Sequence, residues 1–308
     1  MRIQLPKGAF PTMITPFTSD NKIDYSALKA QIEWYLANGV AGLFAVCQSS
    51  EMFYLSLEER VALSKFVVDQ VDHRVSVIAS GHISADFSQQ REELDAIADT
   101  GVDAVVMITC RLAHADESDK QLIQNTEKLL SSLKSDYPLG LYECPYPYKR
   151  VISHEVAKYL ASCGRFSFLK DTSCDINSIR DKLEVFEGSG LQLYNANTAT
   201  LLESLRLGAA GFCGVMGNFH PRLYKHLCEH YYDENAEKLS DELTMLSYIE
   251  KQLYPVNAKY YLGAEGLPVG LQTRSVDPAG FTEGYAAEVN MLRRITYRMY
   301  EEYLPKGE

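Results

Sequence analysis

The sequence predicts an α/β protein with the (β/α)8 fold of a TIM barrel, followed by a C-terminal helical extension. Apolar runs of strand length alternate with amphipathic stretches of helix length along most of the 308 residues, as in repeated βα units. Segments beginning at Ala37, Asp99 and Arg206 repeat one order: helix end, glycine, small residue, apolar strand. Eight such units in about 230 residues fit a closed barrel, and a doubly wound open sheet is the alternative.

The predicted strands are short apolar runs, and each is followed by a helical pattern. The strands cover residues 8–15, 42–46, 76–80, 104–108, 139–143, 166–170, 191–194 and 211–215. The helices cover residues 25–38, 57–72, 87–100, 118–135, 154–162, 176–183, 198–207 and 221–232. Ser56 is an N-cap signal, and Gly39 and Gly101 follow predicted helix ends, where glycine closes a helix. The barrel is therefore expected over residues 1–233.

Residues 234–308 contain no predicted strand and form the predicted helical extension, packed on the barrel. Helical patterns cover residues 236–252, 258–262 and 284–303, and a Gly/Pro-rich crossing covers 263–280. No linker-like composition separates this part from the barrel.

Composition points to an ordinary globular protein that acts on small molecules. Hydrophobic residues make up 46% and charged residues 23%, and the net charge of -11 offers no basic surface for nucleic acid or an anionic membrane. No apolar run approaches the roughly 20 residues of a membrane span, and residues 1–6 do not resemble a signal peptide. We expect a cytoplasmic location.

The seven cysteines include no CxxC pair, which argues against a disulfide framework and a zinc site. Cys47, Cys144 and Cys213 fall near predicted strand ends, so a nucleophilic cysteine is one interpretation. Packing as small apolar side chains is the favoured one. No phosphate-binding loop or dinucleotide motif is present in the sequence. We expect the chemistry to need no metal or organic cofactor.

Lys170 ends the apolar run 166–170, although a strand buried on both faces is expected to be apolar throughout. Because desolvating an ammonium group is costly, a lysine in this place suggests chemistry. Burial can turn a lysine into a neutral amine near pH 7, and such an amine attacks ketones to form a Schiff base. The alternative is a solvated cap of the strand.

Tyr142 ends the preceding apolar run. The carboxyl ends of parallel strands meet at one end of a barrel, so its hydroxyl is expected beside the Lys170 amine, where it would move protons. Core packing is the alternative. Side chains alternate along a strand, so Glu143 is expected to point away from the lumen, the alternative being a second acid or base. His82 and His220 are expected to be hydrogen-bonded bystanders at the rim.

Five motifs in order along the chain resemble one enzyme family. They are Gly8-Ala-Phe-Pro-Thr-Met-Ile-Thr-Pro-Phe17, Cys47-Gln-Ser-Ser-Glu51 leading to Leu55-Ser-Leu-Glu-Glu-Arg60, Tyr142-x-x-Pro145, Phe168-Leu-Lys170-Asp-Thr-Ser173 and Gly208-Ala-Ala-Gly-Phe-Cys-Gly214. Together they resemble the dihydrodipicolinate synthase and N-acetylneuraminate lyase family of class I, pyruvate-dependent aldolases. The resemblance implies that Lys170 forms the Schiff base, that Tyr142 moves protons and that the protein is a homotetramer.

The loop after the second predicted strand is the candidate site for the substrate carboxylate. A turn between strand and helix presents N–H groups and hydroxyls to an anion, which suits Ser49 and Ser50. The alternative is a simple polar turn. Cys213, near the end of the strand 211–215, and Asn197, in the turn after the strand 191–194, are further candidates for substrate contacts.

The chain departs from the family pattern in three places that bear on the substrate. Dihydrodipicolinate synthases carry an arginine shortly after Tyr-x-x-Pro, where this chain has Tyr146-Pro147. They carry a second tyrosine after the fourth strand, where residues 109–113 have none. Sialic acid lyases carry an acidic pair after the seventh strand, where this chain has Asn195-Ala-Asn-Thr198. The loop at 47–50 also has Cys, Gln and Ser at positions where relatives carry Gly, Ser or Thr, and Gly.

The predicted activity is a Schiff-base-forming class I aldolase or lyase acting on pyruvate or a 2-keto-3-deoxy sugar acid. A dehydratase or deaminase of the same family, or an enzyme similar to dihydrodipicolinate synthase, is the alternative. An alternative of another class is a non-catalytic paralogue that binds a keto acid. The sequence leaves open the aldehyde partner, the direction of the reaction and its stereochemistry.

Overall fold

Eight short parallel strands form the centre of the fold in the computed structural model, which describes residues 3–304. The strands are β1 Gly8–Ala9, β2 Gly42–Phe44, β3 Ser76–Ala79, β4 Ala104–Ile108, β5 Leu139–Tyr142, β6 Phe166–Asp171, β7 Gln192–Asn195 and β8 Gly211–Phe212. Their order, β1-β8-β7-β6-β5-β4-β3-β2, follows the chain once around the barrel. The predicted (β/α)8 fold is confirmed.

Backbone contacts close the barrel where β1 and β2 meet. The N–H of Phe44 donates to the carbonyl of Pro11 (3.1 Å) beyond the end of β1. The predicted strand 8–15 shortens to Gly8–Ala9 because Pro11 has no N–H to continue a ladder. On the other side of β1, a Cβ atom on Gly211 would lie 1.9 Å from the carbonyl oxygen of Gly8, so this close approach requires glycine.

The helices between the strands match the predicted ones to within a few residues at most ends. They are α1 Tyr25–Ala37, α2 Leu57–Val71, α3 Phe87–Ala98, α5 Asp119–Ser132, α6 His154–Cys163, α7 Ile176–Phe186, α8 Leu201–Arg206 and α9 Pro221–Glu229. Ser56 caps α2 in a capping box with Glu59, as the sequence predicts for this N-cap. The short helix α4 Thr109–Leu112 was not predicted, because four residues carry no periodic signal.

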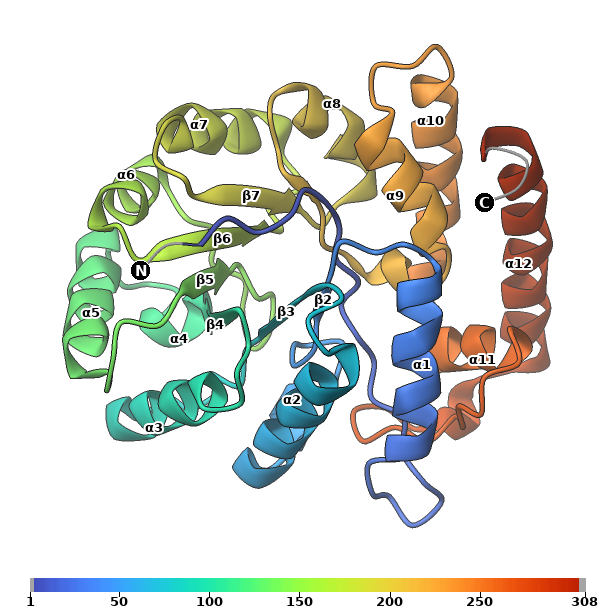
Figure 1. Cartoon of the computed structure of the whole chain (residues 1–308), viewed down its shortest axis with the longest axis horizontal. Coiled ribbons are helices and arrows are strands. Elements are labelled where there is room, and N and C mark those ends of the chain that lie inside the picture. The colour runs from blue at the N-terminus through green and yellow to red at the C-terminus, as the bar shows by residue number, and fades with distance from the viewer. Residues whose placement is uncertain (1–2, 305–308) are drawn as a thin grey trace.

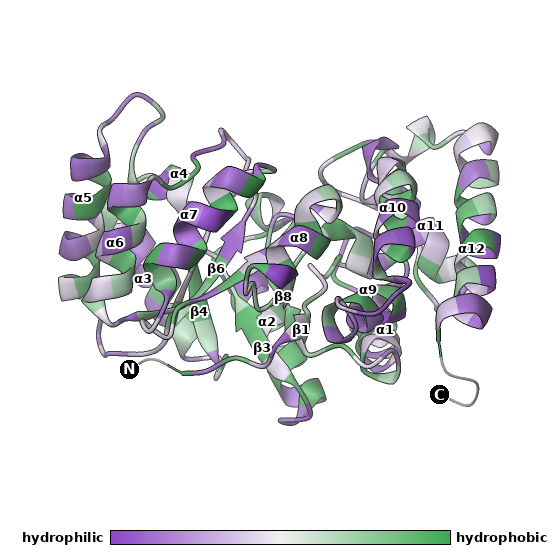
Figure 2. Cartoon of the chain, turned by 90° about the horizontal axis from the view of Figure 1, so that it is seen from above, coloured by the Kyte–Doolittle hydropathy of each residue, from purple (hydrophilic) through white to green (hydrophobic). Residues whose placement is uncertain are grey.

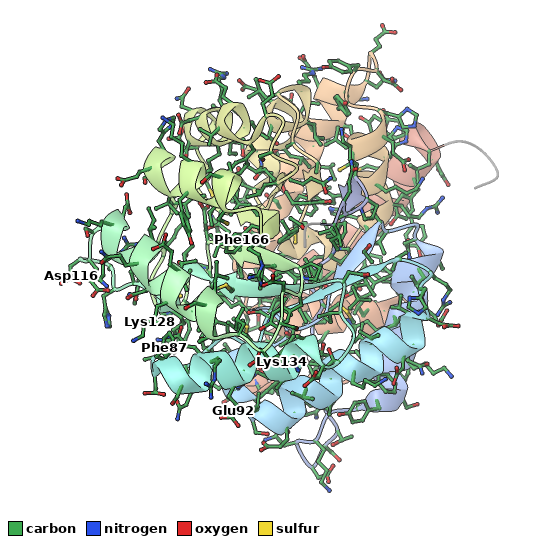
Figure 3. The ribbon with its side chains drawn as sticks, turned by 60° about the vertical axis from the view of Figure 1, so that its left-hand side comes forward. Phe87, Glu92, Asp116, Lys128, Lys134 and Phe166 are labelled. Atoms are coloured by element: carbon green, nitrogen blue, oxygen red, sulfur yellow. The ribbon has the colours of Figure 1, made fainter. Side chains whose placement is uncertain are left out.

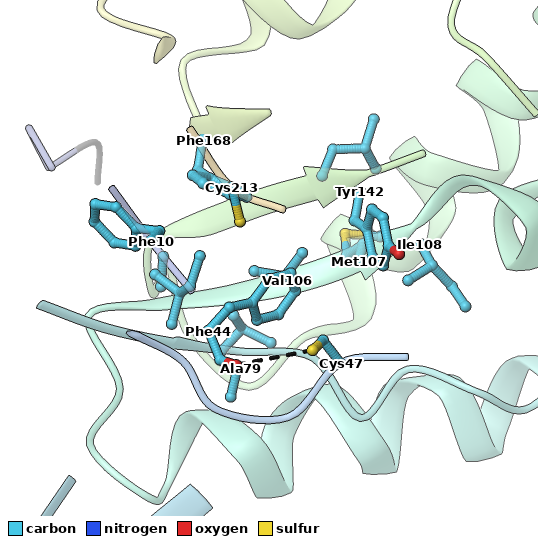
Figure 4. Packing of buried hydrophobic residues seen from close by; sticks show 14 of the residues in the cluster. Phe10, Phe44, Cys47, Ala79, Val106, Met107, Ile108, Tyr142, Phe168 and Cys213 are labelled. Atoms are coloured by element: carbon cyan, nitrogen blue, oxygen red, sulfur yellow. Dashed lines mark hydrogen bonds between the residues drawn. The ribbon is translucent and has the colours of Figure 1, made fainter. Parts of the chain in front are cut away.

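Aromatic and aliphatic side chains fill the lumen of the barrel (Figure 4). Phe10, directly after β1, and Phe44 of β2 both contact Phe168 of β6, with ring centroids 6.4 and 6.2 Å apart. Phe44 also meets the ring of Tyr142 edge to face at 5.8 Å. These rings fill the middle of the lumen, and polar groups lie above them at the carboxyl ends of the strands.

Amphipathic helices cover the outside of the strands. Figure 2 shows hydrophilic and hydrophobic residues on the same helices, for example α5 and α7. Long charged side chains also cover apolar surface between helices, as where the Lys128 ammonium of α5 lies 4.3 Å from the ring centroid of Phe87 on α3 (Figure 3).

The C-terminal segment packs beside α1 and α9 (Figure 1). It contains α10 Ala236–Leu246, the 3-10 turns η4 Ser247–Lys251 and η5 Pro278–Gly280, α11 Val256–Ala264 and α12 Glu283–Tyr303. The predicted helix 236–252 thus breaks at Ser247. Leu239, Tyr261 and Val289 share a hydrophobic core with Phe212 of β8. The division between barrel and extension at residue 233 stays a prediction. Residues 305–308 of the predicted extension lie outside the described residues.

Among residues 3–304, none of the helices is long and apolar enough to cross a membrane.

His220 lies in this shared core and not at the rim. Its ring stacks on Tyr224 at 5.6 Å, and its Nδ1 lies 3.2 Å from the hydroxyl of Thr296 on α12. Its Nε2 has no hydrogen-bond partner among the described residues. Burial lowers the pKa of His220 from 6.5 to about 3, so the folded protein holds this ring neutral.

This burial predicts a pH dependence of stability. Below pH 6.5 the unfolded chain binds a proton at this ring, and the folded chain does not bind it until the pH approaches 3. The free energy of unfolding therefore decreases as the pH is lowered through this range. His220→Gln should remove up to about 1.4 kcal/mol per pH unit of that slope. Urea denaturation between pH 6.5 and 4 measures it, with the exposed His73→Gln as control. Equal slopes in both variants would contradict the assignment.

Candidate active site

A cavity of about 470 Å³ opens at the carboxyl ends of the strands. Residues after β2, β5, β6, β7 and β8 line it, together with Glu250, Tyr254, Pro255, Ser275 and Val276 of the C-terminal segment. Barrel enzymes place their chemistry at this end because loops from all eight strands converge there.

Lys170 of β6 reaches into this cavity from below and is 4% exposed. Its Nζ lies 4.4 Å from the ring centroid of Tyr142 and 5.7 Å from that of Phe44. The described residues give this nitrogen no hydrogen-bond or ion-pair partner, only these ring faces. Lys170 is one of three buried lysines in residues 3–304, and the other two, Lys182 and Lys259, are paired with carboxylates.

Tyr142 of β5 stands directly beside Lys170, since the two residues are register partners on adjacent strands. Its hydroxyl lies 3.4 Å from Oε1 of Gln48 and can donate a long hydrogen bond to it. Burial raises the pKa of Tyr142 well above its usual value, which keeps the phenol protonated at neutral pH. The Tyr142 phenol is therefore protonated, and its ring lies 4.4 Å from the Lys170 amine.

A buried ion triad fixes the two strands from behind. Glu143 follows Tyr142 and Asp171 follows Lys170, and both carboxylates accept from Nζ of Lys182 on α7, at 2.6 and 2.5 Å. Burial opposes the charge on Lys182, but the two carboxylates outweigh it and raise its pKa. Burial and the neighbouring Asp171 raise the pKa of Glu143 despite Lys182. Glu143 thus points away from the lumen, as strand alternation predicts.

The backbone of the loop after β6 is held by the same carboxylates. Thr172 donates its N–H to Oε2 of Glu143 (2.8 Å), and Ser173 donates its N–H to Oδ1 of Asp171 (2.8 Å). Breaking the triad would therefore disturb the loop that carries the chain away from Lys170.

The two predicted carboxylate-binding serines occupy different positions. Ser49 lines the cavity, and its hydroxyl lies 3.0 Å from that of Thr12. Ser50 is turned into the loop, where its hydroxyl donates to the carbonyl of Cys47 (2.7 Å) and accepts from the Cys47 N–H (2.6 Å). The structure brings Ser49 to Lys170 and Tyr142, while Ser50 closes the turn.

Glu51 ties this loop to the C-terminal segment. It adopts the left-handed conformation (φ 63°), and its carboxylate accepts from Nζ of Lys259 (3.0 Å) and from the N–H groups of Arg274 and Ser275 (2.7 and 2.8 Å). Both side chains of the Glu51–Lys259 pair are almost completely buried. This network fixes the wall formed by residues 275–276 over the cavity.

Cys213 and Asn197 do not line the cavity. Cys213 is fully buried, and burial raises the pKa of its thiol to about 12. Asn197 caps the turn η2 Thr198–Thr200 by accepting from the Thr200 N–H (3.1 Å). His82 is buried between Gln90 and the Ile108 N–H. Local turn and packing roles account for these side chains.

All seven cysteines are free; near the site Cys47 and Cys144 are buried, whereas Cys174 is exposed at the cavity. Burial raises the pKa of Cys47 and, more strongly, that of Cys144. A high pKa disfavours the thiolate that nucleophilic catalysis needs. This supports the packing interpretation.

The cavity lining also includes polar residues that were not predicted from the sequence, among them Gln48, Lys149, Glu250 and Tyr254. Lys149 lies two positions beyond Pro147, where the expected arginine is missing, so the cavity still has a cation on that side. Glu250 and Tyr254 come from the C-terminal segment, and no motif marks them. Within the described residues, no group of three or more His, Cys, Asp or Glu side chains could hold a metal ion.

The fold and the site define an α/β-barrel enzyme whose cavity lies over a buried lysine and tyrosine. Residues 5–282 match the dihydrodipicolinate synthetase family, and the chain belongs to this family of pyruvate-dependent, aldolase-type carbon–carbon lyases and synthases.

Similar curated proteins include 4-hydroxy-tetrahydrodipicolinate synthases from two bacteria. The protein of Brachyspira hyodysenteriae is 26% identical over 261 residues, covering 83% of this chain and 85% of the relative. That of Clostridium perfringens is 28% identical over 261 residues, covering 81% and 86%.

Solved structures confirm the fold. Dihydrodipicolinate synthase DapA-2 of Bacillus anthracis superposes with a TM-score of 0.85 at 22% identity, covering 95% of this chain and 99% of the other. The chloride-inhibited synthase of Acinetobacter baumannii, solved with pyruvate, gives 0.84 at 22% identity, covering 94% and 99%.

The triad predicts a large cost for losing its cation. Lys182→Met leaves two carboxylates buried without a counterion, which should lower the free energy of unfolding by about 3–5 kcal/mol. Urea denaturation measures this change, with the exposed Lys158→Met on α6 as the matched control. A loss no larger than that of Lys158→Met would show that the triad does not hold the strands.

Proposed function

We propose that this protein is a Schiff-base-forming class I aldolase that adds pyruvate to an aldehyde or cleaves a 2-keto-3-deoxy sugar acid. The observation that carries the proposal is the unpaired, buried amine of Lys170 beneath the cavity, with the Tyr142 phenol beside it. An amine with no ion-pair partner that faces a substrate cavity is in position to attack a keto group.

Each step of the proposed mechanism has a residue within reach. Nζ of Lys170 attacks C2 of the keto acid, and the keto oxygen takes up a proton to give a carbinolamine. Tyr142 donates a proton to the departing hydroxyl, which leaves as water and gives the iminium. The Tyr142 phenolate left by this step then takes a proton from the substrate. In cleavage the C4 hydroxyl gives up its proton, the C3–C4 bond breaks and the iminium accepts the electron pair; in addition C3 gives up its proton and the resulting enamine attacks an aldehyde.

Ser49 is the proposed anchor for the keto-acid carboxylate, because it lines the cavity in the loop after β2 and carries a hydroxyl that can donate to an anion. Gln48 accepts from the Tyr142 hydroxyl and would orient it, a role that needs no second tyrosine. Pyruvate complexes of the Acinetobacter baumannii synthase and of a prophage protein from E. coli in the same family support a keto acid in this cavity.

A second candidate is 4-hydroxy-tetrahydrodipicolinate synthase activity, which the names of the curated relatives favour. We place it second because this chain lacks the arginine and the second tyrosine that the synthases carry. The homotetramer and the cytoplasmic location remain predictions.

Pyruvate with borohydride should add one irreversible label per chain at Lys170, because reduction of an iminium gives a stable secondary amine. Peptide mass spectrometry locates the label. Lys182 and Lys259 serve as internal controls, since both are paired with carboxylates and neither lines the cavity. A label on either of them, or no label in the folded protein, would contradict the proposed mechanism.

Tyr142→Phe should lower kcat by about 10²- to 10⁴-fold, the usual range for losing a positioned acid or base. Pyruvate binding should change little, because the phenol hydroxyl is not the proposed anchor. Steady-state kinetics and pyruvate titration measure the two effects. Near-normal turnover would assign the proton transfer to another group.

The departures from the family pattern predict narrow specificity. Condensation of pyruvate with aspartate semialdehyde should be negligible and sialic acid cleavage poor, because the charged groups that relatives use for these substrates are absent. A smaller 2-keto-3-deoxy acid should be cleaved well. Specificity constants for the three substrates decide this, and a match between either excluded substrate and the best deoxy acid would contradict it.

A further inference from the structure

Two charged side chains in the outer cavity have no role in the proposed mechanism. Glu250 on η4 and Lys149 in the loop after β5 both line the cavity. Neither makes a hydrogen bond or ion pair among the described residues. The other carboxylate of the cavity wall, Glu51, is fully engaged by Lys259 and two backbone N–H groups. Glu250 and Lys149 are therefore the ionic groups free to meet a substrate there.

The surroundings place these two charges over the same region of the cavity. Cys174, in the loop after β6, also lines the cavity. Burial is the largest cause of the raised pKa of its thiol; the charge of Lys149 lowers this pKa, and the charges of Asp171 and Glu250 raise it. Glu250 is exposed and lines the same cavity as Lys170. Partial burial of its carboxyl raises its pKa, and the charges of Lys251 and Lys170 oppose this increase.

We propose that Glu250 and Lys149 form a specificity pair that selects an uncharged, hydroxylated tail on the substrate. This inference rests on the proposed function, which places the keto acid at Lys170 and its tail toward the cavity mouth. Pyruvate itself has no tail, so the pair acts on the aldehyde or on the distal part of the sugar acid.

Hydrogen-bonding chemistry identifies the tail. An ionised carboxylate only accepts and an ammonium only donates, whereas a hydroxyl does both and satisfies either group. A phosphate or carboxylate tail would pair with Lys149 but meet the like charge of Glu250. An apolar tail would displace water from both ionic groups without replacing its hydrogen bonds.

The remaining wall suits the same tail. Phe53, Tyr54 and Val276 supply apolar surface for carbon-bound hydrogens, and Thr172 and Ser275 lie in the lining with neutral side chains. Recognition of a short polyol needs this combination of few polar groups on a mostly apolar wall.

The test compares aldehydes of one length in the addition of pyruvate. Wild-type enzyme should prefer glyceraldehyde to both glyceraldehyde 3-phosphate and propanal in kcat/KM. Glu250→Gln should reduce the preference for glyceraldehyde over glyceraldehyde 3-phosphate in kcat/KM by about 10-fold or more, the typical effect of losing one charged interaction. Lys149→Gln should reduce the preference over propanal. Glu288→Gln, an exposed glutamate on α12, should leave both ratios unchanged.

Pyruvate and borohydride labelling separates failure of this inference from failure of the proposed function. Absence of a Lys170 adduct in wild-type protein would overturn both. Normal labelling with unchanged aldehyde ratios in Glu250→Gln would overturn the specificity pair alone. Highest activity with the zwitterionic aspartate semialdehyde, lost in both variants, would overturn the polyol assignment, because the pair would then bind two opposite charges.

Discussion

The site depends on one buried interaction, the triad in which Lys182 binds Glu143 and Asp171. Neighbouring residues on a strand face opposite sides, so fixing these carboxylates toward α7 fixes Tyr142 and Lys170 toward the lumen. A shift of either strand by one residue would exchange the two sets and place the ion triad in the cavity. The orientation of the reacting groups is thus set by charges that do not themselves face the substrate.

The contrast among the three buried lysines gives this arrangement its chemical meaning. Lys182 and Lys259 are paired with carboxylates and connect elements of the barrel and its C-terminal segment. Lys170 is buried to a similar extent and faces only aromatic rings. A buried polar group without a partner costs stability, and such a group at the carboxyl end of a barrel strand is where function is expected.

Much of the fold and the centre of the site could be predicted from the sequence, because both follow from strand periodicity. Lys170 and Tyr142 end apolar runs, and alternation alone predicts the outward direction of Glu143. The orientation of Ser50, Cys213 and Asn197 could not be predicted in this way. A residue near a strand end or turn can face the cavity or pack into its own loop, and both arrangements have the same sequence pattern. Glu250 comes from a segment whose path across the barrel is fixed by the distant Glu51–Lys259 pair.

Exchange of the keto oxygen of pyruvate with solvent tests the central claim most directly. Formation of a Schiff base expels this oxygen as water, and hydrolysis of the iminium returns an oxygen from the solvent. In water enriched in the heavy oxygen isotope, wild-type protein should label C2 of pyruvate faster than buffer does, and Lys170→Met should not. Exchange at the buffer rate with wild-type protein, or equal acceleration by Lys170→Met, would contradict a Schiff base at Lys170.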